Sequence, residues 1–223
     1  ETVTLDSGLT NVTYYRNGVQ TATGTLSGVQ NVTPGIIVGN RADGAAPWHG
    51  DIAEILIYDH KLTSTELNEV DGYLADKYGY SSPNASWPSA YSSAVQTEIT
   101  LHQWNKNQAD NYVAMQSANP TMLTTGLFFW VKADAGVTQS SGSVSAWADQ
   151  TGNYSLTHGS SGSPTYIASD INGKPAVSFT GSTQWLYNGS NSGPLGPGFN
   201  ADLTMISVTK TSAPTASQYS LYL

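Results

Sequence analysis

The chain has no cysteine and little charge, and each deficit excludes a class of protein. Without cysteine among 223 residues there is no disulfide scaffold, and a zinc site would depend on four histidines and scattered carboxylates. Eight Lys or Arg face 16 Asp or Glu, and no basic run occurs, so we expect neither nucleic-acid binding nor attraction to anionic membranes. No stretch reaches the roughly 18 apolar residues of a membrane span, and the polar, strand-like beginning is not that of a signal peptide. These features predict a mature, soluble chain without membrane insertion.

Aromatic and hydroxyl side chains are abundant instead. The chain has 6 Trp, 13 Tyr and 52 Ser plus Thr, and 39% of its residues are hydrophobic. That is enough to bury a core, so the low charge does not indicate disorder. The composition suits an exported β-protein with an uncharged polar face. Length alone allows one large sandwich or two small domains.

The first 60 residues predict strands divided by turns. Asn17-Gly18 separates two β-runs, residues 10–15 and 19–23, and Asn-Gly is the strongest short hairpin signal because both residues tolerate positive φ. Two apolar runs, residues 35–39 and 51–59, predict interior strands. The loop between them is rich in Gly, Pro and Ala.

After this β-region the period changes from two to 3.6 residues and predicts a helix of about 12 to 15 residues. Thr63 and Glu66 have the spacing of a capping box, and Gly79 stands where a helix C-cap belongs. The expected apolar face consists of Leu67, Val70 and Leu74. Pro, Ser and Asn in residues 81–87 indicate a linker, and residues 105–116 have the spacing of a second, short helix.

The β-pattern returns after Gly126. Short apolar or alternating runs are separated by turns rich in Gly, Ser and Asn, which indicates an antiparallel sandwich or jelly roll. Too few helices are present for a parallel α/β sheet. The expected strands are residues 127–131, 144–148, 176–179, 184–187 and 203–209.

Two segments resemble the laminin-G-like, concanavalin A-like jelly-roll domains of bacterial surface proteins. Residues 15–80, which include YRNGVQTATG and HGDIAEILIYDHKLTSTELNEVDGYLADKYGY, look like the C-terminal half of such a domain. Residues 126–209, which include GLFFWVKADAGV, VSAWADQTGN and INGKPAVSFTGSTQWLY, are similar to its N-terminal half. The resemblance implies an all-β, concanavalin A-like antiparallel β-sandwich with one or two short helices in the connector. The halves are residues 1–80 and 123–223, joined by residues 81–122.

The halves stand in reversed order relative to the family. The chain is therefore a window from a tandem array, a circular permutant that closes one sandwich from its own halves, or a subunit that completes its neighbour's sandwich by strand exchange. A half sandwich alone exposes a sheet face and its edges and would aggregate. Head-to-tail completion that does not close would give filaments. The apolar end of the chain, residues 219–223, is expected to be a strand that pairs with something, or a cut from a longer chain.

Carboxylate pairs do not predict an enzyme. Glu69 and Asp71 superficially resemble the paired carboxylates of glycosidases, which stand about 5–5.5 Å apart for retention, but here they fall on the expected helix. Asp51 and Glu54 are three apart on a strand, so strict alternation points them to opposite faces. Motifs of serine hydrolases, phosphate loops and zinc proteases are absent.

The turn at residues 149–153 has two interpretations. It resembles a loop that supplies oxygen ligands to Ca²⁺ in laminin-G-like relatives, in which case Asp149, Asn153 and Glu54 would be ligands. The alternative is an ordinary Asx turn in which Asp149 caps its own loop. The sequence also departs from the family at Thr180, where an aspartate is common.

Aromatic side chains beside uncharged polar groups could bind a sugar. Trp130 and Trp147 lie on alternating strands and are expected in the core. The candidate ligand-binding residues are Trp48, His49, Gln184, Trp185 and Tyr187. A core position over the sandwich edge is the alternative for Trp48.

The sequence thus predicts a non-enzymatic extracellular adhesion or carbohydrate-binding module of a multidomain bacterial surface protein, located outside the cell or on its surface. Its partner would be a glycan or a surface protein. The alternative is a structural subunit of a self-assembling filament or array, and a second alternative is a sandwich-fold glycoside hydrolase.

Overall fold

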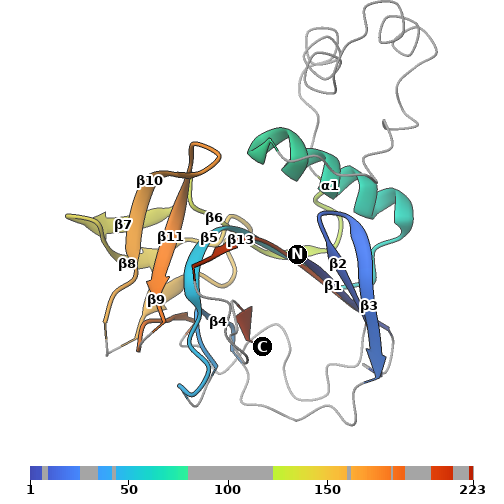
Figure 1. The fold of residues 1–223 in the computed structure, drawn as a ribbon, viewed down its shortest axis with the longest axis horizontal. Helices are drawn as coiled ribbons and strands as arrows, with labels where there is room; N and C mark the ends of the chain where they lie inside the picture. The colour runs from blue at the N-terminus through green and yellow to red at the C-terminus, as the bar shows by residue number, and fades with distance from the viewer. Residues whose placement is uncertain are drawn as a thin grey trace, which may run out of the picture.

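The structure is a computed structural model that describes residues 1–6, 10–25, 35–41, 44–79, 123–159, 162–181, 183–188, 202–212 and 221–222. Strands dominate it, and one helix covers part of the sheet (Figure 1). In chain order the elements are β1 (Thr2–Leu5), β2 (Asn11–Arg16), β3 (Val19–Thr25), β4 (Ile37–Val38), β5 (His49–Tyr58), α1 (Ser64–Tyr78), β6 (Leu127–Lys132), β7 (Val137–Ser140), β8 (Ser143–Trp147), β9 (Leu156–His158), β10 (Thr165–Ile171), β11 (Lys174–Thr180), β12 (Leu186–Tyr187), β13 (Leu203–Thr211) and β14 (Leu221–Tyr222).

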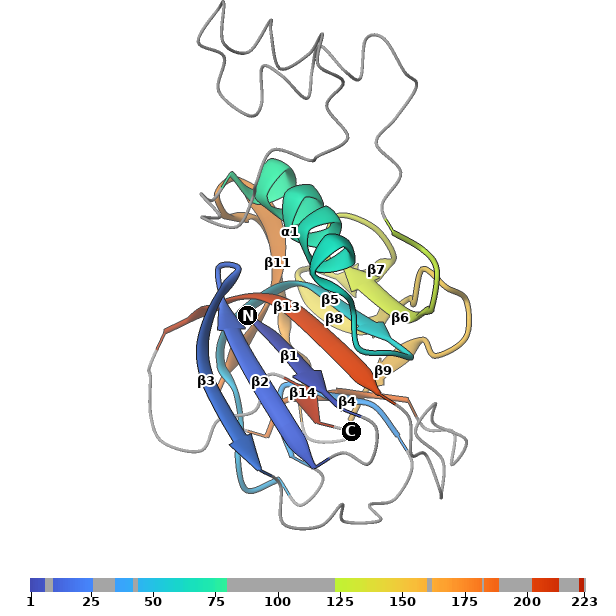
Figure 2. The same cartoon turned by 90° about the vertical axis from the view of Figure 1, so that its right-hand side faces the viewer.

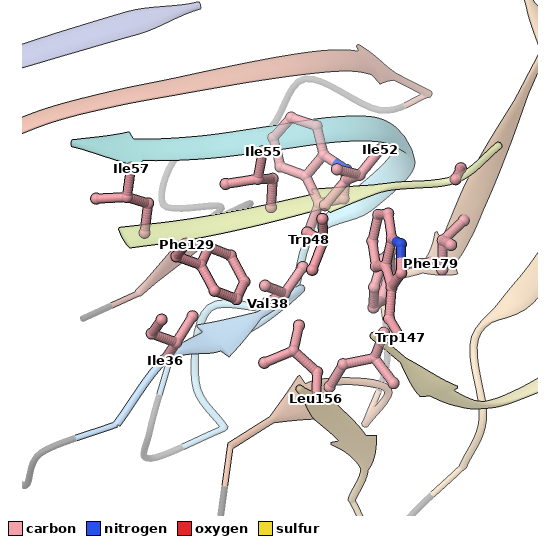
Figure 3. Packing of buried hydrophobic residues seen from close by; sticks show 14 of the residues in the cluster. Ile36, Val38, Trp48, Ile52, Ile55, Ile57, Phe129, Trp147, Leu156 and Phe179 are labelled. Atoms are coloured by element: carbon pink, nitrogen blue, oxygen red, sulfur yellow. The ribbon is translucent and has the colours of Figure 1, made fainter. Parts of the chain in front are cut away.

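The strands form one antiparallel sheet that folds over on itself as a sandwich. Their order is β14-β4-β12-β9-β8-β10-β11-β5-β13-β1-β2-β3, with β6 beside β5 and β7 beside β8. The main core lies between the layer around β5 and β6 and the layer around β4, β8, β9 and β12 (Figure 3). A second apolar cluster lies between the outer side of β5 and α1, which crosses that face (Figure 2). The all-β antiparallel sandwich is confirmed.

The two segments of the chain pair with each other within one molecule. Strands from residues 1–79 hydrogen-bond to strands from residues 123–222 in six places, which are β1–β13, β5–β13, β5–β11, β5–β6, β4–β12 and β4–β14. The last of these gives the apolar segment at the end of the chain a partner strand. The edges that a lone half would expose are thus covered by the other half.

Strand β5 is the junction, and a bulge at Ala53 adapts it to two neighbours. The register with β13 moves from the Val208–Glu54 pair to the Thr209–Ile52 pair, which leaves Ala53 as the extra residue. On the other side β5 pairs with β11 before the bulge and with β6 after it. Ile52 and Ile55 consequently both face the main core, three positions apart. The bulge explains the imperfect alternation of this run in the sequence.

Helix α1 begins and ends where the sequence predicts. Thr63 is the N-cap, its hydroxyl accepts from the Glu66 N–H at 3.3 Å, and the Glu66 carboxylate accepts from the Thr63 N–H at 2.8 Å. Gly79 closes the helix in the left-handed conformation, with φ +67°. The predicted apolar face packs on the sheet: Val70 and Leu74 are buried, and Leu67 is half-buried against them.

The predicted Asn-Gly hairpin is also confirmed. Asn17 and Gly18 have φ values of +50° and +76°, the signs that a two-residue type I′ turn requires, and they join β2 to β3.

Two predictions lie outside the described residues: the linker, residues 81–122, and the short helix within it, residues 105–116. Within the described part of the chain no helix is long and apolar enough to span a membrane.

Candidate functional site

A buried carboxylate, Glu54, fastens α1 to the sheet. It is fully buried on β5 and accepts four hydrogen bonds. Oε1 accepts from the Trp130 indole at 2.6 Å and the Tyr73 hydroxyl at 3.0 Å, and Oε2 accepts from the Tyr78 hydroxyl at 2.7 Å and Lys77 Nζ at 2.8 Å. Burial, and then the Glu54 charge, raise the pKa of Tyr73 and Tyr78, so both hydroxyls stay protonated and donate. Because Trp130 comes from the second segment, this network also ties the two segments together.

The bulge in β5 corrects the expectation for Asp51 and Glu54. Strict alternation separates their side chains, but the extra residue turns both to the side of the sheet away from the main core. They nevertheless have separate partners, since Asp51 lies 3.4 Å from Lys210 whereas Glu54 binds Lys77.

Asp149 caps its own loop. Its Oδ1 accepts from the backbone N–H groups of Trp130 at 2.8 Å and Thr151 at 3.0 Å. Its Oδ2 accepts from the backbone N–H groups of Asn153 at 3.1 Å and Tyr154 at 2.9 Å, and from the Thr151 hydroxyl at 2.5 Å. The arrangement is that of the Asx turn, the alternative that the sequence left open. Donors occupy the oxygen lone pairs through which a cation would bind.

The three residues predicted to bind Ca²⁺ are not arranged as ligands of one ion. Trp130 stands between two of them, with its backbone N–H on Asp149 and its indole N–H on Glu54. The Asn153 amide donates to Thr151 Oγ1 at 3.2 Å. Among the described residues no group of three or more His, Cys, Asp or Glu side chains could hold a metal ion. Calcium therefore stays a prediction from resemblance, without support from these contacts.

Trp48 is a core residue, which is the alternative that the sequence left open, and its burial gives no support to a role in ligand binding. Its side chain is 9% exposed and packs in the main core near Ile52 and Phe179 (Figure 3). Its backbone is held on both sides, by a 2.8 Å bond from its N–H to the Gly39 carbonyl and a 3.0 Å bond from the Gly181 N–H to its own carbonyl. Trp147 is buried in the same core as predicted, and Trp130 is half-buried under α1.

The other four predicted ligand-binding residues lie at or near the surface, and three have structural contacts. The Gln184 amide joins the end of β11 to the segment before β10, with Oε1 accepting from the Thr180 N–H at 2.9 Å and Nε2 donating to the Ser163 carbonyl at 2.8 Å. The Trp185 ring lies so close to Gly159 that a Cβ there would be 2.4 Å from it.

The other two residues, His49 and Tyr187, differ in their packing and exposure. His49 begins β5, and its side chain packs on Gly181. Tyr187 is 38% exposed and points outward, opposite the buried Leu186. Of the four, Tyr187 is the most exposed, and ligand binding at these positions stays a prediction.

A groove of about 560 Å³ lies elsewhere, between α1 and the N-terminal strands. One wall is a single face of α1, formed by Ser64, Leu67, Asn68, Asp71, Leu74 and Tyr78. The opposite wall comes from the start of β1 and the β2–β3 hairpin, and it includes Tyr15, Asn17 and Gly18. The floor is residues 206–209 of β13. Its volume is within the range of about 300–1,000 Å³ that is typical of small-molecule sites.

Fixed contacts shape one end of this groove. Asn172, in the turn between β10 and β11, donates its side-chain amide to the Tyr78 carbonyl and closes the C-terminal end of the helix wall. The Tyr78 ring is held in turn through its hydroxyl on Glu54. The end wall and floor belong to the second segment, so the groove exists only where both segments meet.

Only one of the two carboxylates compared with a glycosidase pair lies in the groove. Asp71 lines it, whereas Glu69 is exposed and does not. Residues two apart on a helix point about 200° away from each other, which explains the separation.

Sequence reasoning missed the groove because five separate stretches of chain build it. The sequence showed Asn17-Gly18 only as a turn, and Asp71 only as one of two carboxylates on the expected helix. The one local signal is the polar spacing of Ser64, Asn68 and Asp71, which share one side of α1 beside its apolar face.

Comparison with known proteins supports the fold. Residues 2–68 match a laminin-G-type family model described as the concanavalin A-like lectin/glucanases superfamily. The match confirms the resemblance for the first segment, and with the antiparallel sandwich it gives a fold of the general carbohydrate-binding or adhesion type. No curated protein and no solved structure matches the chain. The resemblance of residues 126–209 lies outside the match and stays a prediction.

Proposed function

We propose that this chain is a non-enzymatic extracellular module that binds glycans for adhesion. The observation that carries the proposal is the groove of about 560 Å³ on a sandwich of the concanavalin A-like type. Its apolar residues, such as Leu67 and Ile206, lie beside amide and hydroxyl groups, as in sites that bind a partly apolar ligand with a few oriented hydrogen bonds. The extracellular location rests on composition, that is, no cysteine and a high content of Ser and Thr.

The placement of Glu69 and Asp71 does not support the hydrolase alternative that paired these two carboxylates. A glycosidase needs two carboxyl groups facing one bond, about 5–5.5 Å apart for retention and roughly 6.5–9.5 Å for inversion. In the described lining of the groove Asp71 shares the site with Glu1, and Glu69 faces elsewhere. The other carboxylates considered are engaged, Glu54 under the helix and Asp149 in its own loop.

Closure within one chain favours a self-contained module over a filament subunit. Strand β5 has partners on both sides from its own chain, including β13 along most of its length. Strand exchange would have to replace each of these pairings with its equivalent from a neighbour, and gains no new pairing by doing so.

Binding of the intact, fluorescently labelled chain to a printed glycan array tests the function. We expect saturable binding to a subset of glycans, lost when the protein is heat-unfolded before the assay. Absence of binding to every glycan at micromolar protein would refute glycan binding, and a surface protein would then be the partner to seek.

A further inference from the structure

We propose that the groove between α1 and the β1–β3 strands is the ligand site, and that it takes a short uncharged oligosaccharide. The inference rests on the proposed function and names its site and ligand class. None of the predicted ligand-binding residues lines this groove.

Charge selects against acidic glycans. The lining contains two carboxylate side chains, Glu1 and Asp71, against the single amino group of Glu1, and within its described residues no lysine or arginine. The whole chain has a formal net charge of −8. A sulfated or sialylated sugar would be repelled on approach by the chain and in the groove by the carboxylate of Asp71. An uncharged sugar meets neither penalty.

The surface chemistry suits a sugar ring. Tyr15 and the helix residue Leu67 offer apolar and aromatic surface for the C–H face of a pyranose. The lining also includes Asn17 and Asn68 on opposite walls and Asp71 on the helix, whose amide and carboxylate groups would add hydrogen bonds to a sugar beside the contacts that they already make within the chain. Hydrogen-bonding groups on both walls would fix the orientation of a ring that lies between them.

The walls are held in place before any ligand arrives. The helix wall is fastened by Glu54 through Tyr78 and Lys77, and the hairpin wall is joined to the floor through the β1–β13 ladder. A site built on fastened elements loses little conformational freedom on binding, which favours affinity.

Two groove variants and a matched control test the site. Tyr15→Ala removes the aromatic wall, while Tyr14→Ala changes the neighbouring tyrosine, which is 42% exposed and points to the opposite face of β2. Asn68→Ala removes one amide from the helix surface and is expected to fold, since alanine favours helix. Tyr187→Ala probes the other candidate surface.

The assay is glycan-array binding followed by titration calorimetry with the best uncharged glycan, with circular dichroism and thermal melting on each variant. We expect uncharged glycans to dominate, affinity roughly tenfold lower for Tyr15→Ala and Asn68→Ala, and a change of less than about twofold for Tyr14→Ala and Tyr187→Ala.

Three results would overturn the inference. Full affinity in both groove variants, or loss in Tyr187→Ala alone, would leave the proposed function intact and move the site. Binding only to sulfated or sialylated glycans would refute the ligand class. No binding to any glycan would refute the proposed function itself, which the first two results would not.

Discussion

Replacement of the buried Glu54 carboxylate should destabilise the fold strongly, even by a side chain of the same size. Glu54→Gln keeps the shape of the side chain but turns one oxygen into an NH₂ group. Each carboxylate oxygen now accepts from two donors, so in either orientation the new NH₂ meets two donors without an acceptor oxygen. The substitution also removes the negative charge that balances Lys77. The Lys77 side chain is only 12% exposed, so water replaces little of that interaction.

Removing one partner of a buried ion pair costs about 3–5 kcal/mol. Lys77 keeps a second carboxylate, Asp134, at 3.0 Å, so we expect the lower end, about 3 kcal/mol. The matched control is Asp134→Asn, which breaks the other ion pair of the same lysine. Because Asp134 is 35% exposed, that change should cost about 0–1 kcal/mol.

Urea unfolding followed by tryptophan fluorescence measures both costs. Glu54→Gln should lower the denaturation midpoint with the slope unchanged, and the loss should be a large share of a total stability of about 5–15 kcal/mol. A loss below about 1 kcal/mol, or one equal to that of Asp134→Asn, would refute the idea that Glu54 fastens the helix and joins the segments.

Two further predictions concern Trp48 and the helix cap. Trp48→Ala should destabilise the protein by about 3–5 kcal/mol because it empties a core site, and a variant of unchanged melting temperature would contradict that burial. The Thr63 N–H and then its hydroxyl hold the pKa of Glu66 below its usual 4.5, so this stabilisation is complete above pH 4.5 and disappears as pH falls through the lower folded-state value. Wild type should therefore melt higher than Glu66→Gln at neutral pH, and this difference should shrink as pH falls below 4.5. A difference that stays constant from neutral to acid pH would refute this linkage.

Elements specified by short-range chemistry were predictable from the sequence. The capping box of Thr63 and Glu66, the C-cap at Gly79 and the hairpin at Asn17-Gly18 each depend on residues a few positions apart, and the structure has all of them. Most strands of the second segment were also located. The exceptions are β7 and β9, which have little apolar pattern, and the seven-residue β10, which was not predicted.

Features that depend on distant strands were not predictable in this way. The loop composition before β5 suggested an exposed Trp48, but the pairing of β5 with β11 brings that residue under the other layer of the sandwich. The bulge at Ala53 arises where β5 changes partner from β11 to β6, which no local pattern specifies. The groove likewise needs the β1–β13 ladder, whose partners lie about 200 positions apart in the sequence.

The central claim is that residues 1–79 and 123–222 complete one sandwich within a single chain, and an engineered disulfide tests it most directly. Val3 on β1 and Met205 on β13 are direct cross-strand partners, so Cys at both positions places two thiols at bonding distance in a protein that has no other cysteine. After oxidation, a non-reducing gel across a range of protein concentrations should show monomer cross-linked within itself. Disulfide-linked dimers and ladders, in place of that monomer, would show that the halves meet between chains and would contradict the account.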